Sequence, residues 1–259
     1  MTEELKYKFK LDFEFGDCTF EQFADKCHKN LQMVKDIMLA EVVAQLEGDD
    51  ASISFAKFLL GMGADIDAKF GTYSVMSIAS GDIRIDEPDY DFCEFLVKNG
   101  ANINTVGYFG STPLLDAARY GNLDYIKLLV EKGADVNAIE QKYDELDKEG
   151  YYSSVLSNAC RSSSLEIVKY LVEKGAKINR IDPSDETALI NACQHWRSAD
   201  RSAEIVKYLL EMGADVTIGD REGLTALAHA KIKGHKEAEK LSSNILGKQT
   251  SKKYINIYI

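Results

Sequence analysis

Apolar residues recur along the chain with the spacing of short helices, most clearly in residues 112–133, TPLLDAARYGNLDYIKLLVEKG. Both halves of this stretch place apolar side chains three and four residues apart, which predicts two amphipathic helices. Thr112 suits the N-cap of the first helix, and Pro113 suits its first position. Gly121 interrupts the pattern, and Gly133 suits the left-handed residue that ends a helix. The stretch therefore predicts a helical hairpin followed by a turn.

The same pattern occurs several times in the chain. The pentapeptide GADVN at Gly133 has near-copies, GADID, GANIN, GAKIN and GADVT, which begin at Gly63, Gly100, Gly175 and Gly213. Helix-opening tetrapeptides begin at Ser74, Thr112, Ser154, Thr187 and Thr225. The commonest spacings are 21 residues from tetrapeptide to glycine and 12 from glycine to the next tetrapeptide, which gives a unit of 33 residues. Longer units carry insertions of five or nine residues in their connections, as stacked repeats tolerate.

On these motifs the chain resembles the ankyrin repeat family, and residues 110–138 come nearest to the family pattern. The resemblance implies an all-α fold, an ankyrin-repeat solenoid of about six helix-turn-helix units over residues 31–240. Residues 1–30 would then form an N-terminal non-repeat extension with a short β-strand and a helix, and residues 241–259 a C-terminal tail.

The sequence departs from the family pattern at one position of every unit. Other residues replace the histidine of the Thr-Pro-Leu-His motif: Ser77, Leu115, Ser157, Ile190 and Ala228. The hydrogen bonds that this histidine makes between neighbouring units are therefore not expected. Stacking should depend on apolar burial instead, because each unit of a solenoid packs on its neighbours.

Composition and charge narrow the class of partner. The chain has 31 Lys and Arg against 42 Asp and Glu, a formal net charge of −11. This balance disfavours nucleic acid and anionic membranes, and it favours a basic protein partner. No apolar run is long enough to span a membrane, and the first ten residues lack a signal sequence. Five Cys without a CxxC pair indicate a reducing compartment, so we expect a cytoplasmic protein.

Catalytic and cofactor motifs are missing from the sequence. No phosphate-binding glycine loop or nucleophile elbow occurs, and the four His are not spaced as metal ligands. Cys160 and Cys193 occupy equivalent positions of two units, where Ala118 stands in a third, so we expect small buried side chains. The sequence therefore predicts no enzyme activity, no cofactor and no metal site.

The two ends of the chain do not follow the repeat. Residues 6–15 alternate strictly between apolar and polar, which predicts a strand, and residues 252–259 also favour a strand. Two interpretations remain open. The first strand could cover the N-terminal repeat while the tail is loose, or one of the strands could add to a sheet edge in a partner or a second copy.

The family resemblance implies that partners bind the concave side, which the inter-repeat finger loops and the first helix of each unit form. The residues predicted to bind a partner are Phe70, Tyr73, Tyr108, Phe109, Arg119, Tyr120, Tyr143, Glu145, Arg161, Gln194 and Trp196. Further candidates on the same side are Lys69, Val106, Asp116, Asn158, Arg180, Asp182, Asn191 and Arg221. Aromatic and Arg side chains dominate this selection because they are enriched at binding hot spots.

Two insertions leave alternatives open. Residues 140–152, with five acids and three Tyr, could grip a basic partner or be a solvated insertion. Trp196 could project as an anchor or fold back onto a neighbouring unit. The leading function is a non-enzymatic module that binds another protein. An acidic inhibitor or immunity-type protein, which would neutralise a basic toxin or enzyme, is the alternative, followed by self-association through the terminal strands and by a hidden hydrolase.

Overall fold

The computed structural model describes residues 32, 35–40, 50–70, 73–80, 90–107, 110–140, 152–162, 164–194 and 199–255. The chain divides into two compact units, Met1–Tyr108 (unit 1) and Phe109–Ile259 (unit 2). In both units the described residues are mostly helical, which confirms the predicted all-α class. The strand and helix predicted within residues 1–30 lie outside the described residues.

Unit 1 joins short helices through a small hairpin. Its labelled helices are α4 (Asp50–Gly61), α5 (Val75–Ala79) and α6 (Tyr90–Lys98), and residues 35–40 are helical too. Strands β1 (Lys69–Phe70) and β2 (Tyr73–Ser74) pair antiparallel, with Phe70 opposite Tyr73. Ser74 then caps α5, because its hydroxyl accepts the N–H of Ser77 while the hydroxyl of Ser77 accepts the N–H of Ser74.

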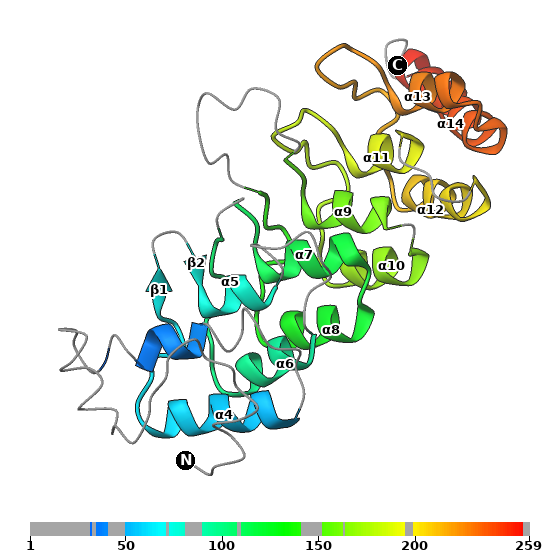
Figure 1. Cartoon of the computed structure of the whole chain (residues 1–259). Helices are drawn as coiled ribbons and strands as arrows, with labels where there is room; N and C mark the ends of the chain where they lie inside the picture. The colour runs from blue at the N-terminus through cyan, green and yellow to red at the C-terminus, as the bar shows by residue number, and fades with distance from the viewer. Residues whose placement is uncertain are drawn as a thin grey trace. The chain divides into compact units, whose positions relative to one another are not determined.

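Unit 2 consists of helix pairs in two layers (Figure 1). The first helices are α7 (Pro113–Tyr120), α9 (Val155–Arg161), α11 (Ala188–Gln194) and α13 (Ala226–Lys233). The second helices are α8 (Leu123–Glu131), α10 (Leu165–Glu173), α12 (Ala199–Glu211) and α14 (Lys236–Ile255). Each first helix packs on the next first helix, and α10 packs on α12 as α12 packs on α14. Helices of one kind therefore stack side by side, as the repeat pattern predicts.

The landmarks read from the sequence act as helix boundaries. The hydroxyl groups of Thr112, Ser154 and Thr225 each accept the backbone N–H three residues later, at 3.4, 3.1 and 3.4 Å. These contacts satisfy a donor that the first turn of a helix leaves unpaired. Gly133 and Gly175, which follow second helices, have φ of 94° and 93°, a conformation that costs other residues free energy.

Small side chains at one position let the first helices of unit 2 lie close together. Ala117, Ala159, Ala192 and Ala230 occupy equivalent positions and are fully buried, as are large apolar residues on the second helices. The thiols of Cys160 and Cys193, one residue further along, are buried too. Their prediction as small interior side chains is confirmed. Apolar burial thus contributes to the stacking, as the missing family histidine led us to expect, and the polar contacts described below add to it.

The turns after the second helices are tied together along unit 2. The amide of Asn137 donates to the carbonyl of Gly175 at 3.1 Å and accepts the N–H of Lys177 at 2.8 Å. Asn179 makes the same two contacts to the following turn, at 3.1 and 2.8 Å. This regular link explains why the fifth residue of the repeated pentapeptide is often Asn, since its side chain offers both a donor and an acceptor.

The C-terminal end differs from the prediction. Helix α14 runs as far as Ile255, so the strand predicted for residues 252–259 is wrong over residues 252–255. The segment is short, and its pattern does not distinguish a strand from the end of a helix, so the continuing helix decides the outcome. Among the described residues, no helix is long and apolar enough to cross a membrane.

Candidate protein-binding face

One side of unit 2, called the finger side below, consists of the first helices and the loops that precede them. At the base of three of these loops a buried acid stands seven residues after the helix-ending glycine: Glu140, Asp182 and Asp220. Each acid donates its backbone N–H to the carbonyl of the residue just before the next N-cap, at 3.0, 2.9 and 3.1 Å. The loop geometry therefore brings a carboxylate against the first helices at regular intervals.

Glu140 links α7 to α9. Its carboxylate pairs with the guanidinium of Arg119 and accepts the N–H of Ser153 at 2.8 Å. The amide of Asn158 lies 3.5 Å from the same carboxylate and donates to the carbonyl of Leu115 at 3.2 Å. Because Glu140 is buried, these contacts compensate for a charge removed from water.

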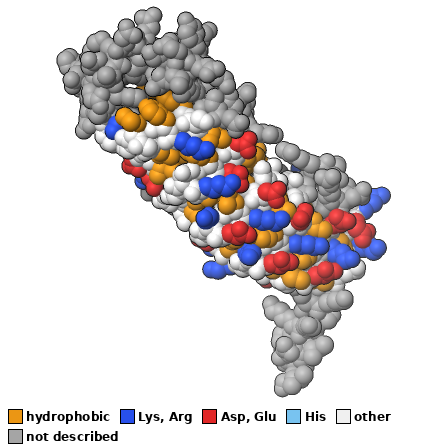
Figure 2. Space-filling model, turned by 90° about the horizontal axis from the view of Figure 1, so that it is seen from below, with side chains coloured by type: hydrophobic (Ala, Val, Ile, Leu, Met, Phe, Trp, Pro, Cys, Tyr) orange, Lys and Arg blue, Asp and Glu red, His pale blue; other side chains and the backbone are white. Residues whose placement is uncertain are grey.

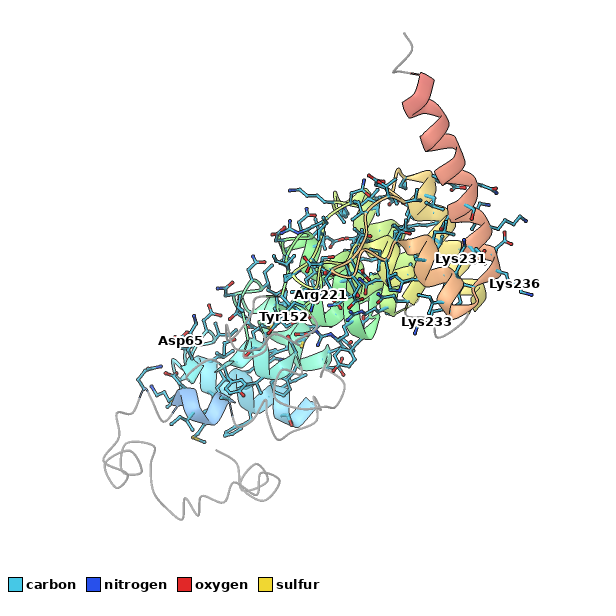
Figure 3. The ribbon with its side chains drawn as sticks, turned by 90° about the horizontal axis from the view of Figure 1, so that it is seen from above. Asp65, Tyr152, Arg221, Lys231, Lys233 and Lys236 are labelled. Atoms are coloured by element: carbon cyan, nitrogen blue, oxygen red, sulfur yellow. The ribbon has the colours of Figure 1, made fainter. Side chains whose placement is uncertain are left out.

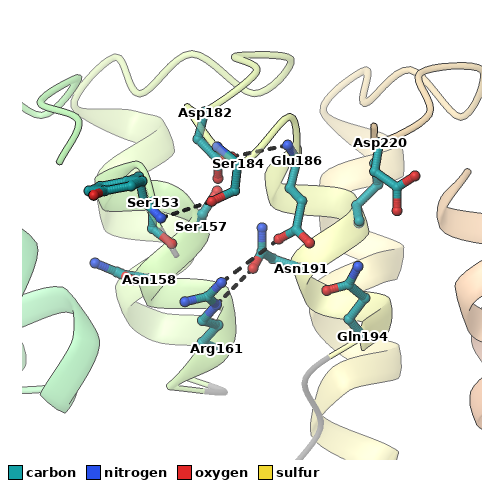
Figure 4. A network of polar contacts seen from close by, with 12 residues as sticks. Ser153, Ser157, Asn158, Arg161, Asp182, Ser184, Glu186, Asn191, Gln194 and Asp220 are labelled. Atoms are coloured by element: carbon teal, nitrogen blue, oxygen red, sulfur yellow. Dashed lines mark hydrogen bonds and ion pairs between the residues drawn. The ribbon is translucent and has the colours of Figure 1, made fainter. Parts of the chain in front are cut away.

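A second network links α9 to α11 (Figure 4). Arg161 donates from Nε to the amide oxygen of Asn191 at 2.8 Å, and its Nη2 lies 3.8 Å from the carboxylate of Glu186. Asp182 accepts the N–H groups of Ser184 and Glu186 at 3.1 and 3.0 Å. The Arg161 side chain is therefore fixed by the following repeat.

Asp182 is the acid of this network whose protonation is most affected. Burial raises the pKa of Asp182 to about 6. The neighbouring Glu186 carboxylate also raises it, whereas hydrogen bonds from Ser157 and from the Glu186 and Ser184 backbone lower it. Desolvation dominates because the charged form of a carboxylate loses its hydration in the interior.

The third network links α11 to α13 through a histidine. Nε2 of His229 lies 2.7 Å from the Asp220 carboxylate and 3.2 Å from the amide nitrogen of Gln194. Asp220 also accepts the N–H groups of Glu222 and Leu224 at 3.0 and 2.9 Å. Burial by itself would raise the pKa of Asp220, but these hydrogen bonds together hold it below its ordinary value.

Comparison with known proteins identifies the repeats. A family model described as "Ankyrin repeats (3 copies)" matches residues 42–140 and 139–220. The chain belongs to the ankyrin repeat family.

Similar proteins support the family and the fold. A putative ankyrin repeat protein of Rickettsia bellii is 32% identical over 69 residues, 27% of this chain and 20% of that protein. The Fowlpox virus putative ankyrin repeat protein FPV233 is 52% identical over 17% of this chain and 9% of its own length. The Fowlpox virus putative ankyrin repeat protein FPV230 is 37% identical over 21% of this chain and 31% of its own length. The chain thus spans less than a third of the curated relatives that it matches.

A solved structure agrees with the architecture. The crystal structure of an ankyrin repeat domain from Acinetobacter baumannii AYE matches with a TM-score of 0.63 and 24% identity. The match covers 80% of this chain and 97% of that domain. At this identity the likeness shows the ankyrin repeat fold and nothing about the ligand.

Three of the predicted binding residues take part in these polar networks and occupy equivalent positions of their repeats. Arg119, Arg161 and Gln194 stand seven residues after their N-caps, and each one contacts the next repeat. Arg119 keeps 42% of its side chain exposed, and the adjacent Tyr120 is 39% exposed. In unit 1, Tyr73 is half-buried in β2.

Other predicted residues cannot be placed on this face. Five of them lie outside the described residues: Tyr108, Phe109, Tyr143, Glu145 and Trp196. Whether Trp196 projects or folds back therefore stays a prediction. Phe70 pairs through its backbone in β1, and its side chain is not described.

Four secondary candidates prove to be interior. Asp116, Asn158, Asp182 and Asn191 are buried between repeats rather than exposed to a partner, so their prediction as surface residues was wrong. The sequence spacing predicted where these residues lie along the chain, but it could not show that a stacked neighbouring repeat covers them.

One exposed apolar residue on this face was not predicted from the sequence. Ile181, in the finger between Arg180 and Asp182, is 53% exposed. The sequence did hold a signal for it, because an isoleucine stands in a turn of polar residues and nothing in the loop pattern requires an apolar side chain there.

The second-helix side is different in character. Figure 2 shows Lys and Arg interspersed with Asp and Glu over the surface seen from below. Lys127 pairs with Asp124 at 4.0 Å, and the ammonium of Lys169 lies 5.8 Å from the ring centre of Tyr208. Mixed charges of this kind are typical of a solvated face and do not mark a site. In the described part of the chain, no group of His, Cys, Asp and Glu could hold a metal ion.

Proposed function

We propose that this chain is a non-enzymatic binding module that recognises a protein partner through the finger side of its repeats. Ankyrin repeats are generally protein–protein interaction modules, and the chain belongs to that family. The observation that carries the proposal is the row of interlocked polar residues that links α7, α9, α11 and α13. These contacts hold side chains of successive first helices in fixed positions beside the fingers.

Fixed side chains favour binding because their conformational entropy is already lost before the partner arrives. Arg119 illustrates this point, since its guanidinium is held by the buried Glu140 while much of the side chain remains accessible. A partner that contacts Arg119 would not need to order a free, flexible arginine. Asn191 and Glu186 hold Arg161 in the same way, but its side chain is only 22% exposed, so it offers a partner less surface.

Exposed apolar groups on the same side would supply the contact energy. Tyr120 ends α7, Ile181 lies in the loop before α11, and both are among the most exposed large hydrophobic residues described. Apolar and aromatic anchors surrounded by polar groups are typical of interface hot spots. We therefore expect Tyr120 and Ile181 to contribute more to affinity than the buried network does.

The test uses a partner captured by the intact chain from cells that encode it, then purified. Tyr120→Ala and Ile181→Ser should each weaken the purified complex about tenfold or more, measured by calorimetry. Met212→Ser, a change to an exposed apolar residue that follows α12, is the matched control and should leave the affinity unchanged. If Met212→Ser weakens the complex while both finger-side variants bind normally, the proposed face is wrong.

The charge distribution favours a second candidate, an acidic inhibitor that neutralises a basic toxin or enzyme. Residues 1–108 carry twenty Asp and Glu against ten Lys and Arg, so nearly all of the net charge of −11 belongs to unit 1. Such a field would steer a basic partner toward unit 1. A steep fall in association rate with added salt would support this candidate, and a salt-insensitive rate would contradict it.

A further inference from the structure

The end of unit 2 carries a surface that the proposed function does not use. Within six residues, Lys231, Ile232, Lys233 and Lys236 are all exposed. Figure 3 shows the three lysines together at the end formed by α13 and the start of α14. Gly234, with φ of 72°, ends α13 and allows the sharp turn into α14 that brings Lys236 beside the last turn of α13. We call these four residues the end patch.

The lysines of the end patch differ from the paired lysines of unit 2. No hydrogen bond or ion pair joins the ammonium groups of Lys231, Lys233 and Lys236 to any residue in the described part of unit 2. Other lysines do pair, as Lys240 does with Glu237 at 3.9 Å. The three charges are therefore available to an external anion.

The residues of the end patch differ from those at the equivalent positions of the other repeats. Lys231 stands where Ala118, Cys160 and Cys193 are buried against the next first helix. In the described part of the chain, no further first helix stacks on α13, so a charged side chain can be solvated here. Solubility alone accounts for Lys231, but acids would serve that purpose equally well in a chain this acidic.

Ile232 is not explained by solubility. It stands where Arg119, Arg161 and Gln194 form polar contacts, and it is 65% exposed, the most exposed of the large hydrophobic residues described. An exposed isoleucine with a lysine on either side of it in the sequence is unfavourable in isolation and favourable if a partner covers it. The surrounding charges determine what kind of partner that is.

We propose that the end patch binds an acidic protein segment that presents an apolar side chain to Ile232. Charge complementarity supports this choice, because residues 231–259 hold seven Lys and two Glu in a chain that is otherwise strongly acidic. An apolar group between carboxylates would match an isoleucine between ammonium groups. The binding uses residues of α13 and the start of α14 and not Tyr120 or Ile181, the anchors proposed above. It requires a partner of the opposite charge from the one that unit 1 would steer.

The test measures fluorescence anisotropy of a labelled dodecapeptide of glutamate with two central leucines, added to the full chain. The triple variant K231E/K233E/K236E should weaken binding at least about tenfold. The control K132E/K177E/K207E changes net charge equally at exposed lysines away from the end patch, on α12 and just after α8 and α10, and should weaken it less than about threefold. Circular dichroism of each variant should match the wild type, since every changed side chain is exposed.

The apolar contact has its own test. Ile232→Ser should weaken binding about threefold or more without changing the salt dependence. A peptide whose leucines are replaced by serine should bind the wild type and this variant equally. Tyr120→Ala should have no effect, which separates the end patch from the finger side.

Three results would overturn the proposal. The first is that the wild type does not bind the glutamate–leucine peptide, or that the triple variant and its control weaken binding equally. The second is tighter binding of oligothymidine of the same length, with loss of that binding in the triple variant, which would make the patch a nucleic-acid site. The third is wild-type self-association that the triple variant abolishes while the peptide remains unbound, which would make a second copy the occupant.

Discussion

Replacing Glu140 tests whether the polar networks, and not apolar burial alone, hold neighbouring repeats together. In Glu140→Ala, the buried N–H of Ser153 loses its acceptor at 2.8 Å. An unsatisfied buried donor costs about 1–3 kcal/mol. Arg119 also loses its ion pair, but its exposed side chain can be hydrated again, so this loss adds at most about 1 kcal/mol. We therefore expect the free energy of unfolding to fall by about 2–3 kcal/mol.

The matched change Glu140→Gln separates the two contributions. Glutamine keeps an oxygen that can accept the Ser153 N–H but carries no charge for Arg119, so the expected loss is about 1 kcal/mol. Glu131→Ala removes an exposed acid from the end of α8 and should change stability by less than about 0.5 kcal/mol. Together the three variants distinguish a buried acceptor from a surface charge.

The assay is urea denaturation followed by far-UV circular dichroism, with a double-mutant cycle that adds Arg119→Ala. A coupling between Arg119 and Glu140 of about 0.5–1 kcal/mol is expected. Since units of a solenoid unfold semi-independently, Glu140→Ala should also broaden the transition. Glu140 does not act as a buried acceptor if Glu140→Ala is as stable as the wild type, or if Glu140→Ala and Glu140→Gln are equally stable.

Three more predictions concern other parts of unit 2. Asp182 has a folded-state pKa of about 6 against an ordinary 3.8, so its contribution to stability is complete below pH 3.8 and is lost as the pH rises through 6. The stability of Asp182→Asn relative to wild type should therefore increase over that interval, in urea titrations at several pH values, and a constant difference would contradict the burial argument. Asn179→Ala removes the two hydrogen bonds to the following turn, at 3.1 and 2.8 Å. In the same assay it should lower the free energy of unfolding by about 1–2 kcal/mol. An unchanged free energy of unfolding would show that water replaces these hydrogen bonds. Burial raises the pKa of the Cys160 and Cys193 thiols, that of Cys193 to about 12. In a variant whose other cysteines are serine, both thiols should therefore resist a thiol reagent until urea unfolds the chain. Rapid labelling of the folded protein would disprove this prediction.

Local chemistry made the helix boundaries predictable. A hydroxyl at Thr112, Ser154 or Thr225 can satisfy the first turn of whatever helix follows, and only glycine enters the left-handed conformation at Gly133 and Gly175 without strain. These effects act within a few residues of chain, so the sequence shows them directly. The wrong strand at residues 252–255 fits the same rule, because its short apolar pattern lacked any capping or turn residue to decide between helix and strand.

The binding face was less predictable because exposure depends on the stacked neighbour. Asn158 and Tyr120 both lie on first helices at positions that a single hairpin would expose, yet α7 and Glu140 cover Asn158 while Tyr120 stays accessible. Ile181 escaped notice for the converse reason, since a loop gives no periodic pattern from which an exposed side chain could be inferred. A polar residue in a repeat can serve the neighbouring repeat or an outside partner, and the pattern is the same in both cases.

The sequence by itself determined the repeating helix pair, its caps and turns, the ankyrin family and the small interior side chains, because each depends on a residue's own conformational preference or volume. Only the tertiary structure decided that an acid and an amide of the next repeat hold Arg119 and Arg161, and that Gln194 lies against His229. It also decided that Ile232 is left exposed. The physical reason is distance along the chain. These contacts join residues about one repeat apart, and whether such a pair meets depends on how successive helices stack.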